Sequence, residues 1–430
     1  MTSRLHSLRS ALGPGIIWAG AAIGVSHLVQ STRAGATFGL GLVGVVIFAN
    51  LYKYPAFSFG PRYAAATGTS LLEGYRQEGT WALVLYAILT VGSMFTIQAA
   101  VTFVTVALLT NLTGWDPALF DIPGFVVLSA GLMASCAIML AIGEYKWLDK
   151  IVKLVVLVLT VTTLLCTFAV LDKLPLDSLR LLPEADWITT ATTAVMLCGL
   201  IGWMPATFEI SIWHSLWTLA RREETGVAPS VSTSLFDFNI GYIGTAILAL
   251  CFVLMGAATM YASGEVFTSS PAGFAAQIIE LYTKNLGTWA GPVVTIAAVT
   301  VMFSTTLSVV DGLPRALATL AARFQRPERA GVFESTNRRV YWVALAILFF
   351  GSLVLIQFFL ASLTLMADVA ATMSLTISPA LAWLNHRAMV SDAVPSEARP
   401  GTLMRVYSRF GIAVSLMLAV YFVSMRWLVA

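Results

Sequence analysis

Residues 13–27 read GPGIIWAGAAIGVSH and residues 199–209 read GLIGWMPATFE, and these two stretches decide the fold. Each lies in an apolar segment that is long enough to cross a bilayer. Each is interrupted near its middle, the first at Gly24-Val25-Ser26-His27 and the second at Met204-Pro205-Ala206-Thr207. An unwound membrane helix exposes backbone carbonyls and helix ends that can face a ligand. The sequence therefore predicts two broken helices that lie side by side at a binding site within the membrane.

The composition predicts an all-α membrane protein with many spans. Of the 430 residues, 58% are hydrophobic and 11% are charged, against about 25% charged in an average soluble domain. The sequence has no phosphate-binding loop, catalytic triad or paired catalytic carboxylates, so an enzyme is not favoured and no cofactor is expected. The apolar runs define eleven candidate transmembrane helices, at residues 13–32, 38–58, 82–110, 122–142, 150–171, 188–218, 236–260, 288–312, 340–360, 363–384 and 406–428.

Lysine and arginine are distributed unevenly between the two sides of the membrane. With the N-terminus in the cytoplasm, the inside segments carry 19 of the 25 Lys and Arg residues and the outside segments carry five. Cytoplasmic loops are enriched in these residues, so we expect the N-terminus inside and the C-terminus outside a cell membrane, such as the bacterial inner membrane. The remaining cation, Lys53, falls within the second span, and we expect its long side chain to reach the membrane interface.

Two short segments resemble each other although this topology places them on opposite sides of the membrane. Glu73-Gly-Tyr75 is followed by Gly79-Thr-Trp81, and Glu280-Leu-Tyr282 is followed by Gly287-Thr-Trp289. The first pair leads into the third span from the inside and the second pair into the eighth from the outside, as an inverted repeat requires. The expected units are a first repeat at 1–171, a second repeat at 188–384 and an additional eleventh span at 406–430.

Several landmarks resemble the Nramp divalent-metal transporters. They are Gly13-Pro-Gly15, the AGATFG stretch at 34–39, Arg62 with Thr67-Gly68, and Met204-Pro205. The landmarks and the eleven-span layout cover most of the chain. The resemblance implies a LeuT-type fold, a 5+5 inverted repeat, and proton-coupled uptake of manganese or ferrous iron.

The residues at the two breaks differ from the metal site that the resemblance implies. In the family an Asp and an Asn in the first break bind the metal, together with an Ala carbonyl and a Met sulfur in the second. Here Gly24, His27 and Ile201 stand at the Asp, Asn and Ala positions, and Met204 is retained. One imidazole and one thioether are few donors for a dication, so the metal ligands stay unknown. The substrate-binding candidates are Gly24, Val25, Ser26, His27, Ile201, Met204 and Thr207.

Polar side chains elsewhere in the spans are candidates for ion coupling, because such residues are costly in a membrane and line pathways. Glu209 follows the second break, and three roles are open: a proton-coupling carboxylate, a partner of His27, or a structural residue. Hydroxyl side chains in the eighth span resemble a LeuT-type sodium site. The coupling candidates are Glu209, Thr305, Thr306 and Asp311, whereas Asp237 and Asp368 near span ends are expected to be structural.

Three functions are compatible with these patterns. The first is a secondary transporter of the Nramp-like class that moves a metal ion through a rebuilt site. The second is a proton- or sodium-coupled transporter of an organic or uncharged solute on the same fold, and the third is a non-transporting sensor. The expected partners are a small transported ion or solute and the lipid bilayer, with no nucleic acid. The sequence does not determine the oligomeric state.

Overall fold

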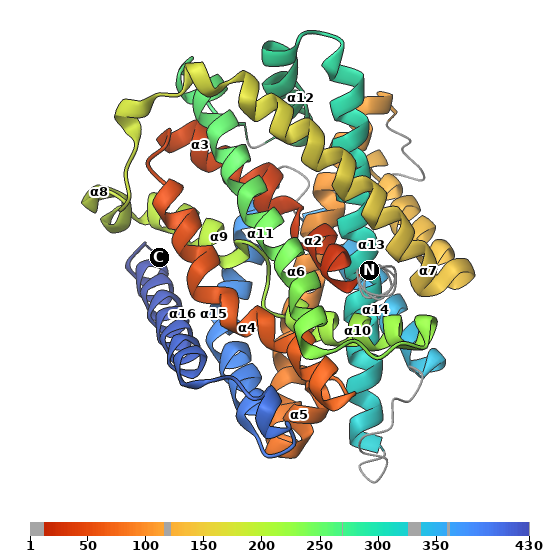
Figure 1. The fold of residues 1–430 in the computed structure, drawn as a ribbon. Coiled ribbons are helices and arrows are strands. Elements are labelled where there is room, and N and C mark those ends of the chain that lie inside the picture. Colours follow the sequence, from red (N-terminus) through yellow and green to blue (C-terminus); the bar gives the residue numbers. More distant parts are fainter. Residues whose placement is uncertain (1–12, 116–121, 269, 326–336, 359–361, 430) are drawn as a thin grey trace, which may run out of the picture.

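The computed structural model describes residues 13–115, 122–268, 270–325, 337–358 and 362–429, which form a bundle of helices (Figure 1). The first part contains α2 (Pro14–Ala22), η1 (Ser26–Ser31), α3 (Thr32–Phe38), α4 (Val43–Thr67), α5 (Leu71–Glu78), α6 (Thr80–Thr113), α7 (Gly124–Ala169), η2 (Leu171–Lys173) and η3 (Leu176–Ser178). The second part contains α8 (Ala185–Thr189), α9 (Ala191–Trp203), α10 (Ile210–Thr225), α11 (Val231–Gly256), η4 (Ala257–Tyr261), α12 (Pro271–Leu286), α13 (Ala290–Gln325), α14 (Arg338–Phe358), α15 (Leu363–Val390), η6 (Ser396–Ala398) and α16 (Thr402–Val429).

The lengths and hydropathy of the helices are those of a protein that crosses a membrane many times. Among the described residues, eight helical stretches are long and apolar enough to cross a bilayer. The three other expected spans correspond to the broken segments α2–η1 and α9–α10 and to α4, which carries Lys53 and two prolines. The positive charges expected at Arg4 and Arg9 lie outside the described residues.

The predicted fourth and fifth spans are both present as apolar stretches that are long enough to cross a bilayer, but no loop separates them. Both apolar stretches, Gly124–Ile142 and Val152–Ala169, belong to the continuous helix α7. The intervening residues 143–151 contain no proline, and they include the helix formers Glu, Lys and Leu. Nothing in this short segment therefore ends the helix, although its charges indicated a loop.

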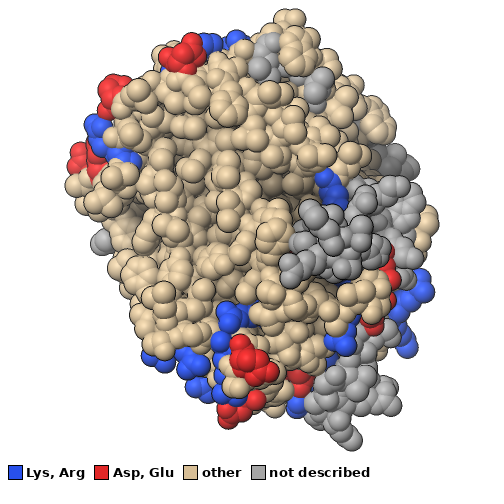
Figure 2. Space-filling model, viewed as in Figure 1, with Lys and Arg blue, Asp and Glu red and all other residues tan. Residues whose placement is uncertain are grey.

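Charged side chains gather at the two ends of the bundle. On the face shown in Figure 2, most Lys, Arg, Asp and Glu lie at the top and bottom, and the broad band between them is largely uncharged. Exposed large apolar side chains such as Ile88, Phe168 and Phe350 belong to the long apolar helices. This distribution matches a bilayer around the middle of the bundle, because hydrocarbon solvates apolar and not charged surface.

The two similar sequence segments have similar local structures. In the first, α5 leads through Gly79 into α6, and in the second α12 leads through Gly287 towards α13. Both glycines have positive φ angles, 125° and 94°, which a residue with a side chain rarely adopts. The expected repeat boundaries stay a prediction. Helix α16 packs outside this arrangement, against α15, α4 and α9 (Figure 1).

Candidate functional site

The first broken helix is formed by α2 and η1. Helix α2 ends at Ala22, Ile23 and Gly24 leave the helical path, and the π-helical segment η1 begins at Ser26. The Ser26 hydroxyl donates to the Ala22 carbonyl at 2.8 Å, which satisfies one acceptor at the break. The predicted interruption near residues 24–27 is confirmed, and it begins one residue earlier than expected.

Asp237 on α11 holds the amino end of α2. Its Oδ1 accepts a hydrogen bond from the Gly13 amide at 3.1 Å, and its Oδ2 accepts one from the Gly15 amide at 2.6 Å. Amides at a helix start lack partners within the helix and carry the positive end of its dipole, so a carboxylate is well suited to them. A Cβ at Gly15 would lie 2.2 Å from the Asp237 carbonyl oxygen, so the Gly-Pro-Gly motif permits close docking on α11.

The second broken helix is formed by α9 and α10. Helix α9 ends at Trp203, α10 begins at Ile210, and the residues between them are not helical. The predicted break at residues 204–207 is confirmed and extends to Glu209. The Ser26 hydroxyl lies 3.3 Å from the Pro205 carbonyl oxygen, so the two breaks meet.

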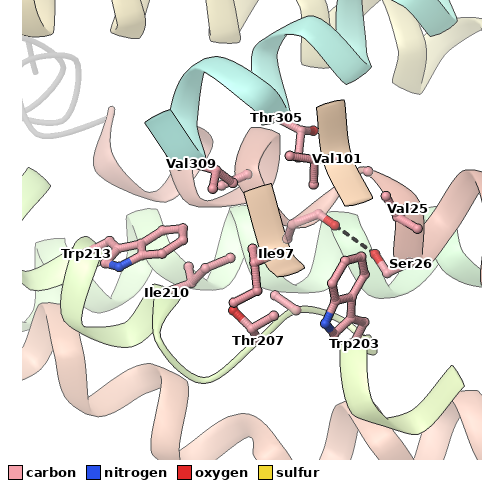
Figure 3. Close-up of a pocket in the computed structure, with 14 residues that line it drawn as sticks. Val25, Ser26, Ile97, Val101, Trp203, Thr207, Ile210, Trp213, Thr305 and Val309 are labelled. Atoms are coloured by element: carbon pink, nitrogen blue, oxygen red, sulfur yellow. Dashed lines mark hydrogen bonds between the residues drawn. The ribbon is translucent and has the colours of Figure 1, made fainter. Parts of the chain in front are cut away.

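A small cavity of about 30 Å³ lies between the two breaks (Figure 3). Its walls come from both broken helices and from α6 and α13. The cavity has room for roughly one water molecule, and all of its lining residues are buried. The lining residues are Ala21, Ala22, Gly24, Val25, Ser26, Ile97, Val101, Trp203, Ala206, Thr207, Ile210, Trp213, Thr305 and Val309.

The cavity lining is apolar with a few polar atoms, and it contains no charged side chain. Among the described residues, the Thr207 hydroxyl and the Trp213 indole nitrogen are buried without a hydrogen-bond partner. Buried polar groups are nearly always paired, and the Thr207 hydroxyl lies near the Glu209 carboxylate. An apolar pocket with a few polar atoms is typical of a site for a small organic molecule.

His27 points away from this cavity. Its Nε2 donates to the Thr245 carbonyl on α11 at 3.0 Å, and its Nδ1 lies 2.7 Å from the Ser26 hydroxyl. His27 is fully buried and is not among the cavity-lining residues, whereas its neighbours Gly24, Val25 and Ser26 are. The imidazole therefore joins the first break to α11.

Glu209 is fully buried at the start of α10, and it also does not line the cavity. Its Oε1 accepts a hydrogen bond from the Ser93 hydroxyl on α6 at 2.9 Å. Its Oε2 is near Thr207 but has no partner at hydrogen-bond geometry among the described residues. The carboxylate thus links α6 to the second break, and no contact with His27 supports a pair between these residues.

The prediction that Lys53 reaches the membrane interface is wrong. Lys53 is fully buried, and its Nζ donates to the carbonyls of Ile201 at 2.5 Å and Gly202 at 3.1 Å. The Ile201 carbonyl also accepts a hydrogen bond from the Met204 amide at 3.3 Å, so the end of α9 supplies acceptors that the helix itself uses only in part. The Ile201 carbonyl is therefore held by Lys53, and the buried Met204 side chain packs in the apolar core outside the cavity lining.

The hydroxyl candidates on α13 lie in two different places. Thr305 faces the first break, where its hydroxyl lies 2.9 Å from the carbonyl oxygens of both Gly20 and Ile23. Thr306 faces α6, and its hydroxyl lies 2.9 Å from that of Thr105. Only Thr305 lines the cavity, so the two neighbouring hydroxyls do not form one site.

Asp311 is engaged in an ion pair below these hydroxyls. Its Oδ1 lies 2.6 Å from a guanidinium nitrogen of Arg315, and its Oδ2 accepts a hydrogen bond from the Trp217 indole at 3.0 Å. Asp368 is similarly paired with Arg33 at 2.9 Å. Both carboxylates tie helices together.

Sequence analysis missed most of the apolar lining. The two indoles of Trp203 and Trp213 are the largest of these side chains (Figure 3). Ile97 and Val101 are four residues apart on α6, as are Thr305 and Val309 on α13, so helical spacing from a known lining residue can find such partners. The cavity therefore has more aromatic and aliphatic surface than the breaks alone indicated.

The described residues contain no group of three or more His, Cys, Asp or Glu side chains that could hold a metal ion. The residues at the breaks also offer no carboxylate to the cavity.

Comparison with known proteins shows the family of the chain. No protein-family profile matches it. An uncharacterized protein of Pasteurella multocida, PM0681, is 37% identical over 317 residues, which cover 73% of this chain and 71% of that protein.

Solved structures show the fold. The Eremococcus coleocola manganese transporter, in complex with an aromatic bis-isothiourea substituted compound, matches with a TM-score of 0.69 at 13% identity, over 97% of this chain and 87% of that one. MhsT in complex with L-phenylalanine has a TM-score of 0.62 at 13% identity, over 96% and 98% of the two chains. Mhp1, a nucleobase-cation-symport-1 family transporter with bromovinylhydantoin bound, has a TM-score of 0.54 at 15% identity, over 97% and 92%. The chain therefore belongs to one family with the Pasteurella multocida protein PM0681, and it has the LeuT-type fold of the Nramp manganese transporter that its sequence resembles.

Proposed function

We propose that the chain is a secondary transporter of a small organic solute without net charge, which binds between the two broken helices. The observation that carries this proposal is the cavity of buried residues from both breaks, with no charged side chain in its wall. A dication in that position would have neither a carboxylate nor a cluster of strong neutral donors. Trp203, Trp213 and the aliphatic side chains instead offer apolar contact to an organic group.

The similar structures support an organic solute on this fold. One neighbour holds L-phenylalanine and another holds bromovinylhydantoin, whereas a third is a manganese transporter. The fold thus accepts different classes of cargo, and the residues of the site decide between them. A metal ion is the second candidate because the Nramp resemblance retains Met204.

Closure at one end of the cavity is attributed to Arg33 and Asp368. The Arg33 guanidinium donates to both carboxylate oxygens of Asp368, at 2.9 and 3.0 Å, and joins α3 to α15. Both side chains keep some exposure, 20% and 14%, so water can reach the pair. In the proposed topology this end faces outwards, with the N-terminus inside and the C-terminus outside the cell membrane.

Thr305 and Glu209 are the groups that we assign to ion coupling. The Thr305 hydroxyl has one hydrogen but three carbonyl oxygens within 3.2 Å, those of Gly20, Ile23 and Val301. Such a concentration of oxygen atoms at the first break suits a hard monovalent cation. Glu209 is the alternative if a proton drives transport.

A thermal-unfolding screen of the purified protein tests the function. The probes are manganese chloride, nucleobases, neutral amino acids and polyols, each with and without sodium chloride. A solute at a hundred times its dissociation constant should stabilise the protein by about 2.7 kcal/mol.

Ala206→Leu is the variant that locates the binding site, because Ala206 lines the cavity and a larger side chain fills it. Ala141→Leu is its control, since Ala141 is exposed on α7. The proposal requires that stabilisation by an organic solute is lost in the first variant and kept in the second. If manganese is the only probe that stabilises the protein, and Met204→Ala abolishes that effect, the protein transports a metal ion instead.

A further inference from the structure

The second break contains a positive charge that the chain itself supplies. The Lys53 Nζ lies 2.5 Å from the Ile201 carbonyl oxygen and 3.1 Å from that of Gly202, at the carboxyl end of α9. The final carbonyls of a helix lack partners within the helix and form the negative end of its dipole. This end of α9 is therefore suited to a cation, and the lysine nitrogen occupies it.

The ring of Phe208 completes the surroundings of the nitrogen. Its centroid lies 5.4 Å from Nζ, within the range of a cation–π contact. Phe208 is itself held in place by Phe57, with stacked rings 5.0 Å apart. Glu209, the next residue along the chain, is close enough to act on Lys53 electrostatically, although no ion pair joins them among the described residues.

These contacts are those of an ammonium ion. A neutral amine has a lone pair that needs a donor, whereas the two carbonyls and the aromatic face all interact favourably with positive charge. A buried charge is stable in a protein only when it is paired or fully hydrogen-bonded. The break supplies such partners because α9 stops at Trp203.

We propose that the Lys53 ammonium is a resident cation, which fills the carbonyl site at the end of α9 and keeps mobile metal ions out of it. Without the lysine, this end of α9 would offer a passing cation the Gly202 carbonyl and that of Ile201, which otherwise accepts a hydrogen bond from the Met204 amide at 3.3 Å. Lys53 is thus the residue that makes the second break independent of a bound metal. The exclusion of metal from transport rests on the proposed function, but the occupancy of the carbonyl site does not.

Chemical rescue of Lys53→Ala tests the occupancy without any knowledge of the solute. This substitution removes a propylammonium group, so n-propylammonium chloride is the probe for the vacated space. Tetramethylammonium chloride is the matched salt, because it has the same charge but no N–H donor. Lys173→Ala is the control variant, since Lys173 is exposed and donates to Asn285.

We expect Lys53→Ala to unfold at least about 3 °C below the wild-type protein, and Lys173→Ala to match the wild type. Saturating n-propylammonium should recover at least half of the loss, and tetramethylammonium should recover none. Lys53→Met, which keeps an apolar stem in place, should be destabilised without rescue. The proposal is overturned if Lys53→Met is as stable as the wild type, or if both salts act equally on Lys53→Ala.

A measurement on the wild-type protein covers the case in which the alanine variant does not fold. The chain has six lysines, at 53, 146, 150, 153, 173 and 284, so side-chain ¹⁵N labelling of lysine gives a simple spectrum. Lys53 should give one ammonium signal that exchanges slowly with water, since its donors are buried and hydrogen-bonded. Rapid exchange of every lysine signal would contradict the proposal. A solute screen without hits would leave both results unchanged, so failure of the proposed function is a separate outcome.

Discussion

Replacing Asp237 should weaken the first broken helix by a predictable amount. The carboxylate is 2% exposed, and it accepts hydrogen bonds from the amides of Gly13 and Gly15 at 3.1 and 2.6 Å. Hydrogen bonds to a charged group contribute about 1.5–3 kcal/mol each to the free energy of unfolding. Since water reaches this site poorly, Asp237→Ala should cost about 3–5 kcal/mol, and Asp237→Asn, which keeps one acceptor oxygen, about half as much.

Denaturant titration in mixed detergent micelles, followed by tryptophan fluorescence, measures this loss. The midpoint should fall while the slope of the transition stays constant, because the native fold is retained. Asp172→Ala is the control, since Asp172 is exposed in η2 outside the broken helices. A free energy for Asp237→Ala within about 1 kcal/mol of the wild type would refute the role of this carboxylate in holding α2.

Three further substitutions test the packing of α3 on α11 and the roles of two buried residues at the breaks. Gly35→Ala places a Cβ 2.1 Å from the Val253 carbonyl oxygen and should lower the free energy of unfolding by at least about 2 kcal/mol. Gly131→Ala, which has open space around the new Cβ, should be neutral or stabilising. Equal denaturation midpoints for the two variants would contradict this prediction. His27→Ala should lower the free energy of unfolding by about 1–3 kcal/mol and leave the affinity for the solute unchanged. A stable His27→Ala variant that no longer binds the solute would disprove this prediction. Glu209→Gln, if a proton drives transport, should abolish the pH dependence of solute flux in proteoliposomes without loss of binding; an unchanged profile would remove Glu209 from the coupling mechanism.

The broken helices could be predicted because their causes are local. Gly24 and Pro205 weaken the helix in which they stand, and the polar residues beside them are unusual in an apolar span. The same local information placed Ser26 and Thr207 at the site, and both line the cavity. In α7, local composition predicted both apolar stretches but not the backbone between them, because the charges of residues 143–151 indicated a loop and the helix continues there.

The contacts of Lys53 and His27 could not be predicted because they join distant parts of the sequence. Lys53 is 148 residues from Ile201, and nothing near it in the sequence indicates that it donates to carbonyls at the end of α9. His27 is 218 residues from Thr245, so its direction depends on the packing of α11. A polar residue in a span therefore identifies a buried interaction, but the partner is fixed only by the tertiary fold.

Flux measurements in proteoliposomes test the central claim most directly. One set of vesicles contains a manganese-sensitive dye, and a second set takes up the radiolabelled solute that stabilises the protein most in the thermal screen. We predict manganese uptake no faster than in protein-free vesicles, together with saturable solute uptake that Ala206→Leu abolishes and Ala141→Leu preserves. Rapid manganese uptake that Met204→Ala abolishes, with no uptake of the solute, would contradict the account.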